Sequence, residues 1–226
     1  MNQDTRAAFL AQLATTSAGR QHMLSIAVDA EEGDEGGIFD QLADVVDDPK
    51  LRRIVERHRD DEVRHARLFR DCLDRLGLEK RAVPEELQII RRIARGAGDA
   101  ATTGPRGGVR TSADVVATYA LLHAIELRGV EQFPVIAAAF RPIDPETADV
   151  YLQVARDERG HVRYCETIGR HYATDDDEWQ TLLELTRALE SQAFDAVTTE
   201  DVVYCIDQGW IARDWLDRDR SVGAAT

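Results

Sequence analysis

Two segments of the chain decide the predicted fold, DDEVRHA at residues 60–66 and RDERGHVRYC at residues 156–165. In each segment a glutamate is followed three residues later by a histidine, a spacing that places both side chains on one side of one helical turn. A carboxylate and an imidazole on a buried helix face are costly unless something satisfies them. Both segments therefore predict helices that turn a metal-binding face toward the interior.

Apolar residues around both segments recur in steps of three and four, which is typical of an amphipathic helix. In the helix expected over 49–76 the apolar stripe passes through the glutamate and the histidine, and the helix expected over 146–172 has the same arrangement. The residues concerned are Glu62, His65, Glu158 and His161. These four are the primary candidate metal ligands.

The rest of the chain also favours helices, because proline and glycine are sparse within long periodic stretches and strict alternation is almost absent. We expect no sheet. The glycine-rich segment 96–110 is expected to be a crossover loop between two similar halves. Further helices are expected over 3–15, 20–46, 84–95 and 112–140, from 175 to 190 or beyond, and finally towards 219 after a cap formed by Thr199 and Asp201.

Each E-x-x-H pair needs a partner carboxylate from a facing helix. In the helix before the last pair, Glu126 lies on the apolar stripe. The first long helix offers Glu31, Glu32 and Glu35, and the helical rise of about 1.5 Å per residue, counted from the intervening turn, favours the first two. Glu32 and Glu126 each precede a phenylalanine by seven residues. We therefore choose Glu32 and keep the other two open.

A glutamate from each of two helices plus Glu-x-x-His from each of two others resembles the site of ferritin-like, rubrerythrin-type di-iron or di-manganese carboxylate proteins. The resemblance covers roughly residues 20–172. It implies an all-α, antiparallel four-helix bundle with a long crossover. The sequence departs from that pattern by an additional helical C-terminal extension over about 175–220, within a single domain, 1–226. The residues that carry the resemblance are Glu32, Glu62, His65, Glu126, Glu158 and His161.

This resemblance implies a dinuclear site in which Glu62 and Glu158 bridge the metals. The remaining ligands would be Glu32 and His65 for one metal, and Glu126 and His161 for the other. The implied cofactor is a pair of Fe ions, with Mn or a mixed Mn/Fe pair as alternatives, because carboxylate and imidazole ligands suit these metals.

The function implied is an oxidoreductase that activates O2 or peroxide, either to act on a small organic substrate or as a peroxide scavenger, with electrons from an external donor. Two alternatives stay open. One is a ferroxidase that handles iron, and the other is a metal-free ferritin-like scaffold protein. The resemblance also implies a homodimer.

The charge and the cysteine pattern of the chain indicate which binding partners and which cellular compartment to expect. The chain of 226 residues has 28 Lys and Arg against 42 Asp and Glu, and its net charge of −14 argues against nucleic acid or an anionic membrane surface. No apolar run is long enough to cross a bilayer. The three cysteines form no C-x-x-C pair, which favours a reducing, cytoplasmic location and disfavours a rubredoxin-type iron site.

Three glycines, Gly33, Gly36 and Gly37, interrupt the first long helix beside the candidate ligands. Each costs up to about 1 kcal/mol of helix propensity relative to alanine. A bulge that opens room for a substrate and a locally frayed or kinked helix are both open interpretations. His58 and His123, each one turn before a candidate glutamate, are interpreted as core histidines in preference to extra ligands.

Overall fold

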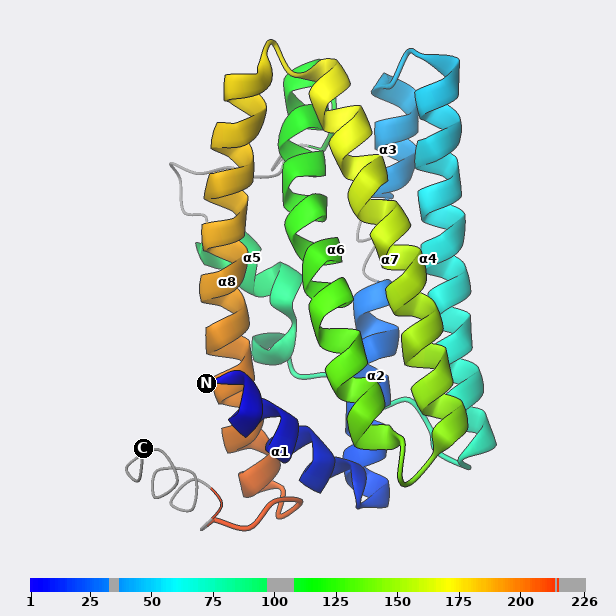
Figure 1. Cartoon of the computed structure of the whole chain (residues 1–226), viewed down its shortest axis with the longest axis vertical. Coiled ribbons are helices and arrows are strands. Elements are labelled where there is room, and N and C mark those ends of the chain that lie inside the picture. The colour runs from blue at the N-terminus through cyan, green and yellow to red at the C-terminus, as the bar shows by residue number, and fades with distance from the viewer. Residues whose placement is uncertain (33–36, 97–107, 214, 216–226) are drawn as a thin grey trace.

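The computed structural model describes residues 1–32, 37–96, 108–213 and 215. Within these ranges the secondary structure is helical and contains no strand, which confirms the predicted all-α class (Figure 1). The helices are α1 (Gln3–Ala14), α2 (Ser17–Glu31), α3 (Ile38–Val45), α4 (Pro49–Arg75), the short 3-10 helix η1 (Glu85–Leu87), α5 (Ile89–Gly96), α6 (Ser112–Phe140), α7 (Pro145–Tyr172) and α8 (Asp176–Asp207).

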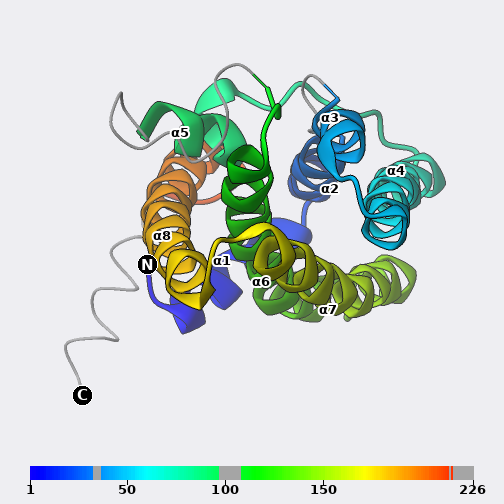
Figure 2. The same cartoon turned by 90° about the horizontal axis from the view of Figure 1, so that it is seen from above.

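The long helices α4, α6, α7 and α8 run side by side, with α6 against α7 along most of their length. Helix α4 packs against α7 and also against α2 and α3, which follow one another along it (Figure 1). On the other side of α6 lies α8, and the view from above shows α5 beside α8 (Figure 2). Helix α1 crosses one end of the molecule and contacts α6 and α2. Helices α1 and α8 thus pack against α6, and α5 packs against α8.

The buried apolar side chains form two clusters at opposite ends of the long helices. Phe69 of α4 and Tyr151 of α7 belong to one cluster, whereas Val55 of α4 and Ile168 of α7 belong to the other. Along both helices, the buried glutamates and histidines lie between these positions. A polar layer therefore separates two apolar cores, and each core fixes one end of the helices that carry the layer.

The single helix expected over 20–46 is wrong, because the structure has two helices there, α2 and α3. Gly37, which caps the start of α3, has a φ of 65°, a left-handed conformation that glycine adopts without strain. Helix α2 therefore ends at Glu31, and α3 begins after Gly37. Glu35, Gly33 and Gly36 lie outside the described residues.

The helix start expected at Thr199 and Asp201 is also wrong, because α8 continues through both residues to Asp207. The hydroxyl of Thr199 donates to the carbonyl of Asp195 four residues earlier, and Asp201 is buried against His22. Residues of the capping type are accommodated within a helix when the backbone or a tertiary partner satisfies them. The expected continuation towards 219 lies almost wholly outside the described residues.

The predicted starts of α4 and α6 are confirmed by their caps. The Asp48 carboxylate accepts from the backbone N–H of Lys50 and Leu51 ahead of a helix that begins with Pro49. Thr111 and Asp114 form a reciprocal capping box at the start of α6. These local signals fix the residue at which each helix begins. Most of the crossover expected over 96–110 lies outside the described residues.

Asp144, just before α7, is expected to make a pH-dependent contribution to stability. It is 7% exposed and accepts from both terminal nitrogens of Arg75, at 3.0 and 2.7 Å. Burial alone would raise the pKa of Asp144, but hydrogen bonds from Arg75 and Thr147 lower it below its usual value. We expect Asp144→Asn to lower the free energy of unfolding by about 1.5–3 kcal/mol at pH 7.

The sign of the pH dependence follows from the lowered pKa. The stabilisation is present above the pKa of the unfolded carboxyl, about 3.9, and is lost as the pH falls through the folded value. Denaturant unfolding of the variant and the parent from pH 7 down to pH 3 checks this, with Asp74→Asn on the exposed face of α4 as control. A difference that stays constant across this range would contradict it.

Candidate metal centre

Seven side chains from four helices meet in the polar layer. Six of them are at most 8% exposed, and the side chain of the seventh, Glu62, is 17% exposed. Three come from α4 at steps of four and three residues, which puts them on one face of that helix. The seven are Glu31 of α2, His58, Glu62 and His65 of α4, Glu126 of α6, and Glu158 and His161 of α7.

The two E-x-x-H pairs face each other across the layer. Nδ1 of His65 lies 3.3 Å from Oε1 of Glu158, a residue of the other pair, and Nδ1 of His161 lies 3.1 Å from Oε1 of Glu62. His161 is also 2.8 Å from the Glu158 carboxylate on its own helix, and 3.6 Å from Glu126 of α6. The structure therefore brings together five of the six predicted ligands.

Glu32 is the predicted ligand that the structure does not bring to the layer. Its carboxylate accepts from Nε of Arg70 at 2.6 Å, and its side chain is 35% exposed. The neighbouring Glu31, which the sequence left open, is 8% exposed and lies 3.2 Å from Nδ1 of His65. Glu31 and not Glu32 is thus the α2 carboxylate of the cluster. A helix rotates about 100° per residue, so one position separates the buried face from the exposed one.

Two aspartates that the sequence reading missed hold the outer nitrogens of the histidines. Nε2 of His65 lies 3.4 Å from Asp157, and Nε2 of His161 lies 3.5 Å from Asp61. A metal-binding histidine commonly donates its second N–H to a carboxylate, which orients the ring and fixes which nitrogen is free. Here that leaves Nδ1 of both rings toward the glutamates. The available signal was the aspartate directly before the glutamate in both motifs.

The guanidinium of Arg64 joins these two aspartates. Its Nη2 donates to Asp61 at 2.8 Å and to Asp157 at 3.0 Å. One cation therefore ties the α4 motif to the α7 motif on the outer side of the cluster.

His58 belongs to the cluster, although the sequence favoured a core role for it. Its Nε2 lies 3.0 Å from Oε1 of Glu126 and 3.4 Å from Oε1 of Glu62. His123 matches its predicted core role, because it is 5% exposed and its ring stands edge-on to Trp179 at 6.3 Å. Both histidines had the same predicted role because each lies one turn before a candidate glutamate.

Hydrogen bonds to carboxylates dominate the protonation of the histidines. Burial alone would lower the pKa of His65, but its contacts with Glu158 and Glu31 raise that pKa to about 10. The pKa of His161 is likewise raised, because hydrogen bonds to Glu126 and Glu158 outweigh burial. In the metal-free protein these imidazoles therefore hold protons that balance the buried carboxylates.

The pKa values of two neighbouring glutamates, Glu158 and Glu126, are shifted in opposite directions. Burial and the adjacent charge of Glu126 raise the pKa of Glu158 to about 8. Burial would also raise the pKa of Glu126, but hydrogen bonds from Glu158 and the histidines hold it well below its usual value. Neighbouring buried carboxylates cannot all ionise without cations. Metal binding must replace the protons that balance the layer, so it releases protons.

The donor atoms fit a pair of metal ions. Two overlapping groups of four residues, His58–Glu62–Glu126–His161 and Glu62–His65–Glu158–His161, offer ligand atoms that lie within 4.8 Å of one another. Oε1 of Glu62 is buried, and its contacts are the ion pairs with Nδ1 of His161 at 3.1 Å and Nε2 of His58 at 3.4 Å. A buried carboxylate is costly without a neighbouring cation, and a coordinated metal ion would replace the protonated imidazoles in that role.

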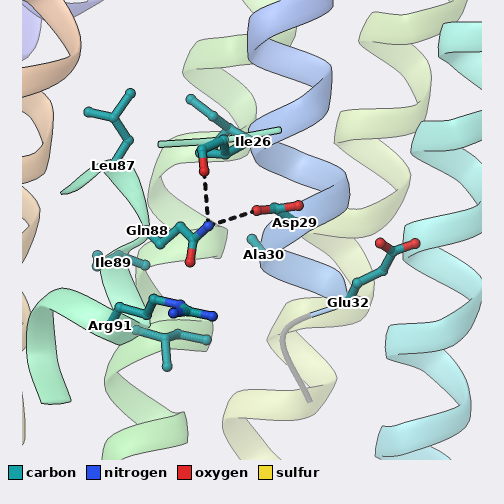
Figure 3. A pocket seen from close by; sticks show the side chains of 10 residues that line it. Ile26, Asp29, Ala30, Glu32, Leu87, Gln88, Ile89 and Arg91 are labelled. Carbon is teal, nitrogen blue, oxygen red and sulfur yellow. Dashed lines mark hydrogen bonds between the residues drawn. The ribbon is translucent and has the colours of Figure 1, made fainter. Parts of the chain in front are cut away.

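A cavity of about 220 Å³ reaches the cluster. Carboxylates from all four helices line it where it meets the cluster, namely those of Glu31, Glu62, Glu126 and Glu158. On the outer side of α2 a separate groove is closed by the segment that carries η1 and α5 (Figure 3). There Gln88 donates to Asp29 at 3.2 Å and to the Val83 carbonyl at 3.0 Å, which fastens that segment to α2. Small molecules thus have space beside the cluster.

Comparison of the chain with models of known families, with curated proteins and with solved structures found no match. Among the helices of the described ranges, none has both the length and the apolar composition needed to cross a membrane.

Proposed function

We propose that the protein is a dinuclear metal oxidoreductase that activates O2 or peroxide. The observation that carries the proposal is the meeting of four glutamates and three histidines from four helices in one buried layer. This pattern supports a ferritin-like, rubrerythrin-type site, because it supplies one glutamate from each of two helices and Glu-x-x-His from each of two others.

In this proposal two metal ions would be held by the glutamates and histidines of the cluster. Glu31 and His65 would serve one ion, Glu126 and His161 would serve the other, and Glu62 and Glu158 would serve both. His58 is a further nitrogen donor on the side of Glu126. All donors are oxygen or nitrogen, which suits iron and manganese.

When bound, a pair of iron or manganese ions supplies redox chemistry on O2 or peroxide. The chain's own residues hold the donor atoms and control protons. Asp61 and Asp157 keep Nδ1 of both histidines toward the ligand layer. The two apolar cores above and below shield the layer from solvent at both ends of the helices, and this low-dielectric surrounding strengthens its electrostatic interactions.

An organic substrate is favoured over iron storage because of the cavity beside the cluster. Its exposed lining is predominantly apolar, which suits an organic molecule better than hydrated iron ions. The electron donor is external in this proposal, because the sequence carries no C-x-x-C pair for a second iron site.

Elemental analysis of the purified protein after anaerobic Fe(II) loading tests the proposal. We expect about two Fe per chain, followed by O2 consumption when air is admitted. Loading far beyond that ratio with deposition of Fe(III) would identify an iron-handling protein instead. A folded protein with no bound Fe or Mn would overturn the proposal in favour of a metal-free scaffold.

Glu31, the last residue of α2, and Glu32, which follows it, allow a direct test of which glutamate belongs to the metal site. We expect Glu31→Gln to lower the bound metal and Glu32→Gln to leave it close to the parent value. The reason is that only Glu31 contacts a cluster histidine, whereas Glu32 binds Arg70. Metal content after identical loading checks this. The opposite ranking of the two matched variants would remove Glu31 from the site.

A further inference from the structure

The cavity beside the cluster has an apolar middle. Its apolar lining comes from α2, α6 and α8 and includes Met23, Ile26, Ile125, Phe133, Ile136 and Val197. The side chains of η1 and α5 close it on one side, because Leu87 and Ile89 line both this cavity and the groove drawn in Figure 3. The volume of about 220 Å³ lies below the ~300–1,000 Å³ of drug-sized pockets, so the occupant is small.

Away from the cluster, the cavity ends in polar side chains. Arg6, Arg128 and Gln132 line this end, and the same three residues line a surface hollow of about 570 Å³. They therefore stand between the cavity and the surface. Gln132 follows Glu126 by six residues on α6, which corresponds to about 9 Å along the helix axis.

Two arginines at this end differ in how their charge is neutralised. Arg128 binds both carboxylate oxygens of Glu190, at 2.9 and 2.8 Å. Arg6 donates only to neutral groups, to the Gln132 amide oxygen at 2.7 Å and to the Thr198 hydroxyl at 3.1 Å. Within the described ranges no carboxylate forms an ion pair with Arg6. A guanidinium has five N–H donors, so Arg6 keeps capacity for a further acceptor.

Asp201, the acidic group that acts most strongly on the charge of Arg6, is already engaged. Asp201 also lines the cavity, but its Oδ1 lies 2.7 Å from Nε2 of His22 and 3.6 Å from Sγ of Cys205. Burial lowers the pKa of Arg6 to about 10, although the charge of Asp201 acts in the opposite direction. The Arg6 charge is therefore only partly compensated by the protein itself.

We propose that this cavity binds a small, elongated monocarboxylate, with its carboxylate on Arg6 and its apolar body extending toward the glutamates of the cluster. The proposal rests on the proposed function in that it names the substrate class of the same site. A planar guanidinium and a carboxylate form strong, charge-assisted hydrogen bonds. The rise of about 9 Å along α6 from Glu126 to Gln132, a residue that binds Arg6, corresponds to roughly seven or eight bonds of extended chain, so octanoate is a suitable probe.

Calorimetric titration of the full-length protein with octanoate and with octan-1-ol tests the proposal, before and after metal loading. We expect octanoate to bind more tightly than the alcohol. Arg6→Gln should weaken octanoate binding by about 10- to 100-fold while leaving the alcohol unchanged. The matched control is Arg53→Gln, a substitution on the exposed face of α4, and it should bind both compounds like the parent.

A second variant separates cavity binding from contact with other apolar surfaces. Val197→Phe places a larger side chain in the cavity lining and should abolish binding of both compounds. Equal affinity for acid and alcohol in the parent protein, or octanoate binding that survives Val197→Phe, would overturn the proposal.

The metal-free and metal-loaded titrations keep the two proposals distinguishable. Octanoate binding to a protein that takes up no metal would support the carboxylate site and contradict the metal oxidoreductase. Normal metal loading without octanoate binding would contradict the carboxylate site alone.

Discussion

His161→Ala is expected to reduce the bound metal from about two ions per chain to about one or fewer. His161 lies within 3.6 Å of three glutamates of the cluster, more than any other histidine there. Loss of a hydrogen-bond partner outside the ligand set alone weakens metal binding by about 10- to 100-fold, and loss of a ligand should cost at least as much. Elemental analysis after anaerobic Fe(II) loading gives the direct readout.

His123→Ala is the matched control for this experiment. His123 is also a buried histidine, but it packs against Trp179 and not against the cluster. We expect this variant to retain its metal. Circular dichroism of both variants establishes that each is folded. Full metal content in folded His161→Ala would remove His161 from the ligand set.

Trp179→Ala is expected to produce the largest loss of stability, about 3–5 kcal/mol. The indole is fully buried where the start of α8 meets the apolar core of Val115 and Ile168. Its fit is close, because a Cβ on Gly169 would lie 2.1 Å from the indole Cζ3. The indole nitrogen makes no hydrogen bond within the described ranges, so the loss reflects packing alone.

Denaturant unfolding measures this effect, with Trp210→Ala as control. Trp210 is only half-buried, and we expect its replacement to cost clearly less. Equal losses for the two variants would contradict the assignment of Trp179 as the main apolar anchor of α8.

The helices of the centre could be predicted wherever local signals agree with the apolar pattern. The bounds of α4, α6 and α7 follow from Asp48 with Pro49, from the Thr111–Asp114 box and from Pro145. The two E-x-x-H pairs and Glu126 could be predicted as one group because they lie on those well-defined helices. Side chains on regular helices keep their phase over many turns.

The prediction of Glu32 was wrong because it assumed one continuous helix, whereas α2 and α3 are separate helices. Within α2, the buried residues Leu24 and Val28 point to Glu31 as the next residue on the same face, three positions after Val28. Including Phe39 in the same stripe shifted the choice, but Phe39 belongs to α3, whose orientation is independent of α2. Height along the bundle could not separate residues that differ by one position.

The side-chain contacts between helices could not be predicted from the sequence, for a different reason. The aspartates Asp61 and Asp157 each serve a histidine of the other helix, and no spacing within one segment predicts such an exchange. Thr199 and Asp201 suggested a helix start, yet tertiary contacts and the backbone of α8 accommodate them. Local patterns describe elements well, whereas partners depend on how the elements pack.

The reciprocal contacts across the layer make the two halves of the chain interdependent. His65 in the first half relies on Glu158 and Asp157 of the second, and His161 relies on Glu62 and Asp61 of the first. Among the described residues, neither half supplies all seven side chains of the cluster. A chain cleaved between α5 and α6 would therefore bind metal only while its two fragments remain associated, and metal would in turn act as a clamp that opposes their separation.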